Sequence, residues 1–81
     1  MFKVQSVLLS RKSYTLEKAV NWLFANGFNV KKVDATPNYW RFRQNAPSVL
    51  RREGYTRYIS KDITPDIQFI IVYNTSAPQK G

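Results

Sequence analysis

The apolar and polar positions change period several times along the chain, and the first change separates a strand from a helix. Residues 2–10 are rich in β-branched and other apolar residues, which is typical of a strand. Their apolar side chains fall on both faces of that strand, with Phe2, Val4 and Leu8 on one face and Val7 and Leu9 on the other. This distribution indicates a strand that is covered on both sides or one that contains a β-bulge.

Residues 16–26 have the period of an amphipathic helix. Apolar side chains recur at the spacing of one helical face, at Leu16, Ala19, Val20, Leu23 and Phe24. Thr15 stands at the N-cap position, Glu17 complements the helix dipole, and Gly27 supplies a left-handed C-terminal cap. Trp22 lies beside the apolar face, and we interpret it as packing along the edge of a helix–sheet interface, with contact to a partner as the alternative.

The rest of the chain predicts four more strands separated by turn residues. They span residues 28–33, 39–44, 55–62 and 67–73. Residues 34–38 and 64–66 have turn composition. Residues 46–54 hold a proline, two adjacent arginines and a glycine, which predicts a loop with room for one helical turn.

The predicted order is β-α-β-β-β, which indicates an α+β fold. A strand, a helix and a strand in succession favour two parallel strands joined by a right-handed crossover, and short turns favour antiparallel hairpins. We therefore expect one helix packed on one face of a mixed four- to five-stranded sheet. Residues 1–73 are predicted to form a single domain, and residues 74–81 a flexible C-terminal tail.

Composition narrows the possible chemistry. The chain contains neither cysteine nor histidine, which excludes a disulfide framework and the usual zinc sites, so we expect no cofactor and no metal. The apolar run near the N-terminus is short and interrupted by Lys3, Gln5 and Ser6, which predicts neither a signal peptide nor a membrane span. We expect a soluble, intracellular protein that does not bind membranes.

No motif for catalysis is present. The sequence has no nucleophile elbow and no glycine-rich phosphate loop, so we expect a protein that is not an enzyme. Asp62, Asp66 and Glu53 offer carboxylates for Mg²⁺, but the two aspartates flank a turn, where Asp is favoured for local hydrogen bonding. Residues 13–15, next to Arg11 and Lys12, are interpreted as a helix cap in preference to a phosphate site.

Positive charge is concentrated in one segment of a chain whose formal net charge is +8. Five of the six arginines fall between residues 41 and 57. Because side chains alternate along a strand, Trp40 and Phe42 are predicted to face the core, whereas Tyr39, Arg41 and Arg43 face the other way. We expect this basic face to continue into Tyr55 and Arg57 on the fourth strand. The candidate nucleic-acid-binding residues are Tyr39, Arg41, Arg43, Arg51, Arg52, Tyr55 and Arg57.

Two functions fit this segment. Arginines that neutralise phosphates and tyrosines that stack on bases suit nucleic acid, single-stranded in preference to duplex. An exposed sheet with Arg and Tyr also suits an acidic protein surface, and the protein would then serve in assembly through the sheet face or an edge strand, with oligomers as one outcome.

The run from residue 4 to residue 44 resembles small uncharacterised proteins of bacteriophages and large DNA viruses. The resemblance lies in VQSVLLSRKSYTLEKAVNWLFANGF, with its Thr-started helix and Asn-Gly-Phe end, and in KKVDATPNYWRFRQ, whose Arg-Phe-Arg-Gln run is the most distinctive piece. Gly54, Tyr55 and Arg57 are also similar to that group. The resemblance implies a viral origin, a role in virion assembly or genome handling, and a place in the virion or the host cytoplasm or nucleus. It assigns no role to any residue.

Overall fold

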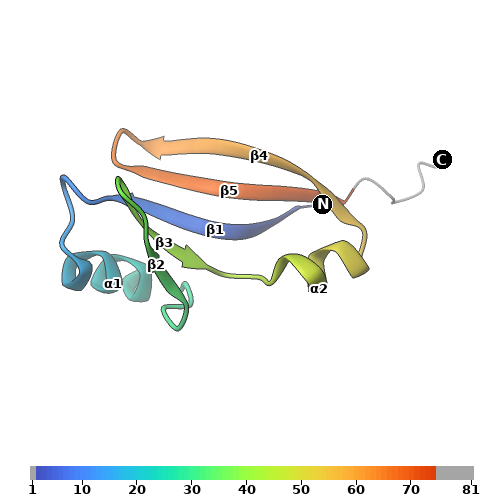
Figure 1. The fold of residues 1–81 in the computed structure, drawn as a ribbon, viewed down its shortest axis with the longest axis horizontal. Coiled ribbons are helices and arrows are strands. Elements are labelled where there is room, and N and C mark those ends of the chain that lie inside the picture. Colours follow the sequence, from blue (N-terminus) through green and yellow to red (C-terminus); the bar gives the residue numbers. More distant parts are fainter. Residues whose placement is uncertain (1, 75–81) are drawn as a thin grey trace.

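The computed structural model describes residues 2–74, which form one five-stranded antiparallel sheet and two helices (Figure 1). The elements are β1 (Phe2–Ser10), α1 (Leu16–Ala25), β2 (Val33–Ala35), β3 (Tyr39–Arg43), α2 (Pro47–Arg52), β4 (Tyr55–Thr64) and β5 (Ile67–Asn74). The strands lie in the order β2-β3-β1-β5-β4. Asn74, predicted to begin the C-terminal tail, is the last residue of β5, and residues 75–81 of that tail lie outside the described residues.

The predicted mixed sheet is wrong, because every neighbouring pair of strands is antiparallel. β1 lies at the centre and pairs with β3 on one side and β5 on the other. The chain that leaves α1 does not return beside β1. It forms the short β2 first, and the following hairpin turn brings β3 alongside β1 in the antiparallel direction. The α+β class with a single sheet is confirmed.

Residues 28–32 were predicted to form most of the second strand but form a loop. The side chain of Gln44 replaces the strand ladder there. Its Oε1 accepts from the N–H of Asn29 and its Nε2 donates to the C=O of Asn29, each at 2.8 Å. Phe28 and Val30 pack against the core from this loop. Their alternation therefore arises from side-chain packing and does not reflect a strand.

The first strand and the first helix agree with the sequence analysis. β1 has the predicted bounds. Its pairing with β5 contains an irregularity between Val4 and Ser6, which agrees with the β-bulge, one of the two alternatives that the apolar pattern left open. Thr15 caps α1, because its Oγ1 accepts from the N–H of Lys18 at 3.2 Å. Gly27 has a φ of 79°, the left-handed conformation expected after a helix.

The prediction of a single helix is wrong, because the six-residue α2 forms where a loop with room for one helical turn was expected. Pro47 lies in the first turn of α2. The N–H groups of a first turn have no acceptor within the helix, so a proline there costs no hydrogen bond. Arg51 and Arg52 lie in its last turn, where cations complement the helix dipole. Leu50 is its one fully buried side chain. A helix held by a single apolar side chain has no periodic pattern that the sequence could reveal.

The two helices lie at opposite ends of the sheet (Figure 1). The two core clusters show that they pack on opposite faces of it. One face, which we call the α1 face, carries the main core: Val7, Leu9, Phe42 and Ile67 against Ala19 and Leu23 of α1. Val72 points to the other side and packs with Leu50 and Tyr55, which defines the α2 face. Since α2 is short, most of the α2 face has no helix above it.

Candidate nucleic-acid interface

β3 separates the aromatic core residues from the arginines, as the sequence predicted. Phe42 is fully buried in the core under α1, and Trp40 packs against that core while its Nε1 donates to the C=O of Tyr14 at 2.8 Å. The Arg11 guanidinium lies 4.6 Å from the centre of the Trp40 ring. The core assignment of Trp40 and Phe42 is confirmed.

Tyr39, Arg41 and Arg43 lie on the α2 face, opposite Ser10, Leu8 and Ser6 of β1. Arg41 is half-buried, and its Nε donates to Ser6 Oγ at 3.4 Å. Ser6 is itself buried and donates to Gln5 Oε1 at 2.7 Å. The Nε side of the Arg41 guanidinium is therefore fixed by a residue of the neighbouring strand β1. Its terminal nitrogens form no hydrogen bond within residues 2–74, so both can donate to a ligand.

Arg43 has a weak acidic neighbour. Its Nη2 lies 3.8 Å from Oδ2 of Asp34 on β2, and the Asp34 side chain is 60% exposed. The Nε of Arg43 is buried and has no hydrogen-bond partner among the described residues. An ion pair of this length at the surface contributes little to stability. Arg43 is therefore available to an anion that binds it at hydrogen-bond distance.

A hollow of about 380 Å³ lies beside Arg41 on the α2 face. Leu8 and Ile70 form an apolar floor, while Arg41 and Tyr58 line it from β3 and β4. Its other lining residues are Gln5, Thr36 and Pro47. Tyr58 is 45% exposed, which leaves its ring accessible from solvent. An exposed ring and a guanidinium around an apolar floor can hold a flat ring and an attached anion.

Sequence reasoning missed Tyr58, because it placed β4 directly beside β3. β1 and β5 lie between them, so the two strands do not share a continuous edge. Tyr58 pairs with Val72 and therefore faces the α2 side together with Arg41. The turn at residues 64–66 predicted a hairpin of β4 and β5, but not the position of β5 beside β1 or the register that places Tyr58 opposite Val72.

Two predicted residues on β4 are separated from the basic face. Tyr55 is only 4% exposed and packs with Leu50 and Val72, so its ring has no open face for a base. Arg57 pairs with Tyr73, which places it on the α1 face. The register shift between Tyr55 and Arg57 explains why these two side chains do not share one side of the sheet.

Arg51 and Arg52 are exposed on α2. Arg51 lines a small hollow of about 150 Å³ with Tyr55, Thr56 and Tyr58, so it lies next to the larger hollow. At the opposite end of the α2 face, Lys12 lines a third hollow, of about 340 Å³, with Ser10, Asn38 and Tyr39. Cationic side chains therefore accompany the hollows along the α2 face.

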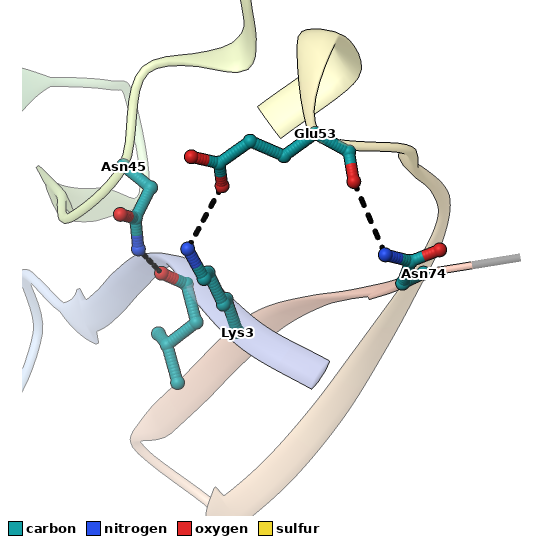
Figure 2. Close-up of polar contacts among 5 residues, drawn as sticks. Lys3, Asn45, Glu53 and Asn74 are labelled. Carbon is teal, nitrogen blue, oxygen red and sulfur yellow. Dashed lines mark hydrogen bonds and ion pairs between the residues drawn. The ribbon is translucent and has the colours of Figure 1, made fainter. Parts of the chain in front are cut away.

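Polar contacts fix the end of α2 on the sheet (Figure 2). Lys3 Nζ donates to Glu53 Oε1 at 2.9 Å, and Asn74 Nδ2 donates to the C=O of Glu53 at 3.1 Å. At the other end of the helix, just before its N-terminus, Asn45 Nδ2 donates to the C=O of Val4 at 2.8 Å. The hydrogen bond and the charge of Glu53 raise the pKa of Lys3 above its ordinary value, against a smaller opposing effect of desolvation. Glu53 is thus engaged with Lys3 and does not offset the arginines of α2.

Two of the three acidic residues considered for Mg²⁺, Asp62 and Glu53, are engaged elsewhere. Asp62 accepts from Gln68 Nε2 at 2.9 Å, and Glu53 pairs with Lys3. Within residues 2–74, no three side chains of the metal-ligating types come together. Over the same residues, neither helix has the length and apolar character needed to cross a membrane.

Comparison with known proteins finds no match to a protein-family model, to a curated protein or to a solved structure. The resemblance to phage and viral proteins therefore stays a prediction. Function has to be inferred from the geometry of the α2 face.

Proposed function

We propose that the protein is a non-enzymatic module that binds single-stranded nucleic acid on the α2 face. The observation that carries the proposal is the hollow between Arg41 and Tyr58, on the sheet face that α1 leaves uncovered. A base stacks on the Tyr58 ring above Leu8 and Ile70, while the Arg41 guanidinium contacts the adjoining phosphate.

The charges around the hollow support a polyanionic ligand. Arg43 and Tyr39 continue the face along β3, and Arg51 and Arg52 flank it on α2. The formal net charge of +8 draws nucleic acid toward the protein from a distance. Tyr58 takes the stacking role first expected of Tyr55. Arg57 is not part of this face.

The shape of the site favours a single strand over a duplex. The hollow lies on a sheet, and the helix beside it, Pro47–Arg52, is short and packed against that sheet. Reading a duplex in its major groove requires a helix or a two-stranded ribbon that projects into the groove. A sheet with exposed aromatic rings instead accepts bases that are already unstacked.

A salt titration tests the proposal. Binding of labelled single-stranded and duplex oligonucleotides is measured by anisotropy as a function of salt concentration. Arg41→Ala combined with Arg43→Ala should weaken binding and reduce the slope of log affinity against log salt by roughly 0.7 for each phosphate that the variant no longer neutralises. Lys31→Ala combined with Lys32→Ala, two exposed cations in the loop before β2, is the control of equal charge change. Absence of binding near physiological salt would contradict the proposal.

An acidic protein docked on the same α2 face is the second candidate, in keeping with a role in virion assembly. The apolar floor of Leu8 and Ile70 favours it, because protein interfaces combine an apolar centre with arginine and tyrosine. In that case the arginine variants would abolish capture of the protein partner, while the wild-type protein would bind no oligonucleotide at any salt concentration.

A further inference from the structure

β4 is an edge strand whose outer side pairs with no strand of residues 2–74. It is ten residues long, and every residue after Tyr55 is exposed. The opposite edge, β2, has only three residues. A long exposed edge presents backbone N–H and C=O groups that a further strand can bind. β4 is therefore the part of the sheet best suited to accept another strand.

Two irregularities limit the usable part of this edge. The register of β4 against β5 shifts between Tyr55 and Arg57 and again between Asp62 and Thr64. The segment from Arg57 to Asp62 is regular between these two points. We call this segment the β4 edge. It is long enough to form a ladder with a short extended peptide.

The side chains of the β4 edge follow a simple order on the α1 face. Arg57, Ile59 and Lys61 pair with Tyr73, Ile71 and Phe69 of β5, so a cation, an apolar side chain and a second cation lie in a row. Ile59 is 37% exposed, although its side chain is apolar. An added strand would complement this row if it placed an acidic, an apolar and a second acidic side chain opposite Arg57, Ile59 and Lys61.

A hollow of about 400 Å³ adjoins this row on the α1 face. Arg57, Ile59, Tyr73 and Asn74 line it. Next to it, Phe2 is 55% exposed, with its ring centre 5.7 Å from that of Tyr73. α1 packs at the other end of the sheet and does not cover this region (Figure 1). The hollow can receive an apolar side chain of an added strand.

We propose that the β4 edge binds an extended acidic segment of a partner protein by strand addition, with an apolar side chain of that segment beside Ile59 and carboxylates against Arg57 and Lys61. Charge complementarity identifies the partner, since the edge row holds two cations and the whole chain carries +8. The one acid of the segment, Asp62, lies on the α2 face with Gln68.

A second copy of the chain fits this edge poorly. Two-fold antiparallel pairing of the edge with itself centred on Ile59 places Arg57 opposite the Lys61 of the other copy. Centring the pair on Ser60 makes the same two cations diagonal neighbours, and centring it on Lys61 opposes two lysines. Each register thus adds local repulsion to that between two chains of charge +8.

The test uses a fluorescein-labelled peptide with the core Glu-Thr-Ile-Thr-Glu, blocked at both ends, and anisotropy as the readout. The core reads the same in both directions, so either orientation places Glu opposite Arg57 and Lys61. Arg57→Glu combined with Lys61→Glu should weaken binding about tenfold and should instead bind the matching Lys-Thr-Ile-Thr-Lys peptide. The control of equal charge change is Lys31→Glu combined with Lys32→Glu, which should retain most of the binding.

Two further measurements separate strand addition from simple charge attraction. A Glu peptide methylated at alternate backbone nitrogens should lose binding, because it cannot complete the ladder. Arg41→Ala combined with Arg43→Ala should leave peptide binding intact, since those arginines lie on the other face. Absence of peptide binding, equal binding of the methylated peptide, or a dimer of the protein alone that competes with the peptide would each overturn the proposal.

Discussion

Tyr55 and Tyr58 lie three residues apart on β4, yet only one of them is accessible. The register shift after Tyr55 turns its ring toward Leu50 and Val72, where 4% of the residue remains exposed. Tyr58 follows the regular part of the strand and is 45% exposed. A single irregularity in a strand therefore decides which tyrosine can stack on a base.

Lys3 and Glu53 give a prediction at the residue scale. Because Glu53 raises the pKa of Lys3, the stability from this pair is present below the ordinary lysine pKa of 10.5 and is lost as pH rises through the raised value. We expect the wild-type protein to be more stable than Glu53→Gln at about pH 8, and this small difference to shrink toward about pH 11. Urea unfolding midpoints at the two pH values measure it.

The matched control for this pair is Glu17→Gln, an exposed acid in the first turn of α1. Its effect on the unfolding midpoint should stay constant over the same range, because it acts on the helix dipole without a lysine partner that loses its proton. A Glu53→Gln difference that grows with pH would contradict the assigned role of Lys3.

Alternation along the chain correctly predicted which residues of β3 face the core and which face away from it. Trp40 and Phe42 are in the core and Arg41 and Arg43 are on the other face, because β3 pairs with β1 without a shift. Arg57 was placed wrongly relative to the basic face, because that placement depended on which strands are neighbours. Neighbouring strands are determined by contacts between distant residues, which alternation does not describe.

At the scale of elements, α2 was the segment that sequence patterns described least well. Leu50 holds it on the sheet together with Tyr55 and Val72, and the Lys3 pair and the Asn74 hydrogen bond secure its end (Figure 2). Val72, Lys3 and Asn74 are far from α2 in sequence, so local composition carried no sign of these contacts. The loop at residues 28–32 was wrongly predicted as a strand, because its apolar side chains alternate although its residues are not part of a strand.

Leu50→Ala tests the contribution of α2. Removing this fully buried side chain should lower the free energy of unfolding by about 2–5 kcal/mol, because it leaves a cavity between the helix and the sheet. Denaturant unfolding measures the change. Val49→Ala, at a site that is 40% exposed on the same helix, should cost clearly less. Equal losses in the two variants would show that α2 is not anchored by Leu50.

At the scale of the whole molecule, the two helices lie at opposite ends of the sheet (Figure 1). Because they also pack on opposite faces, they leave two separate surfaces uncovered. The α2 face offers Arg41 and Tyr58 around an apolar hollow, and the β4 edge offers Arg57 and Lys61 on the other side. Under the two proposals, one small domain would hold a nucleic acid and a protein strand on separate surfaces.

The proposal that single-stranded nucleic acid binds on the α2 face is tested most directly by locating a bound oligonucleotide on the sheet. Amide chemical shifts are followed by NMR while a single-stranded oligonucleotide is added to the ¹⁵N-labelled protein. We expect the largest changes at Leu8, Arg41 and Tyr58, which line the hollow of the α2 face. Changes centred on Arg57 and Ile59 of the opposite face, or no changes at all, would contradict it.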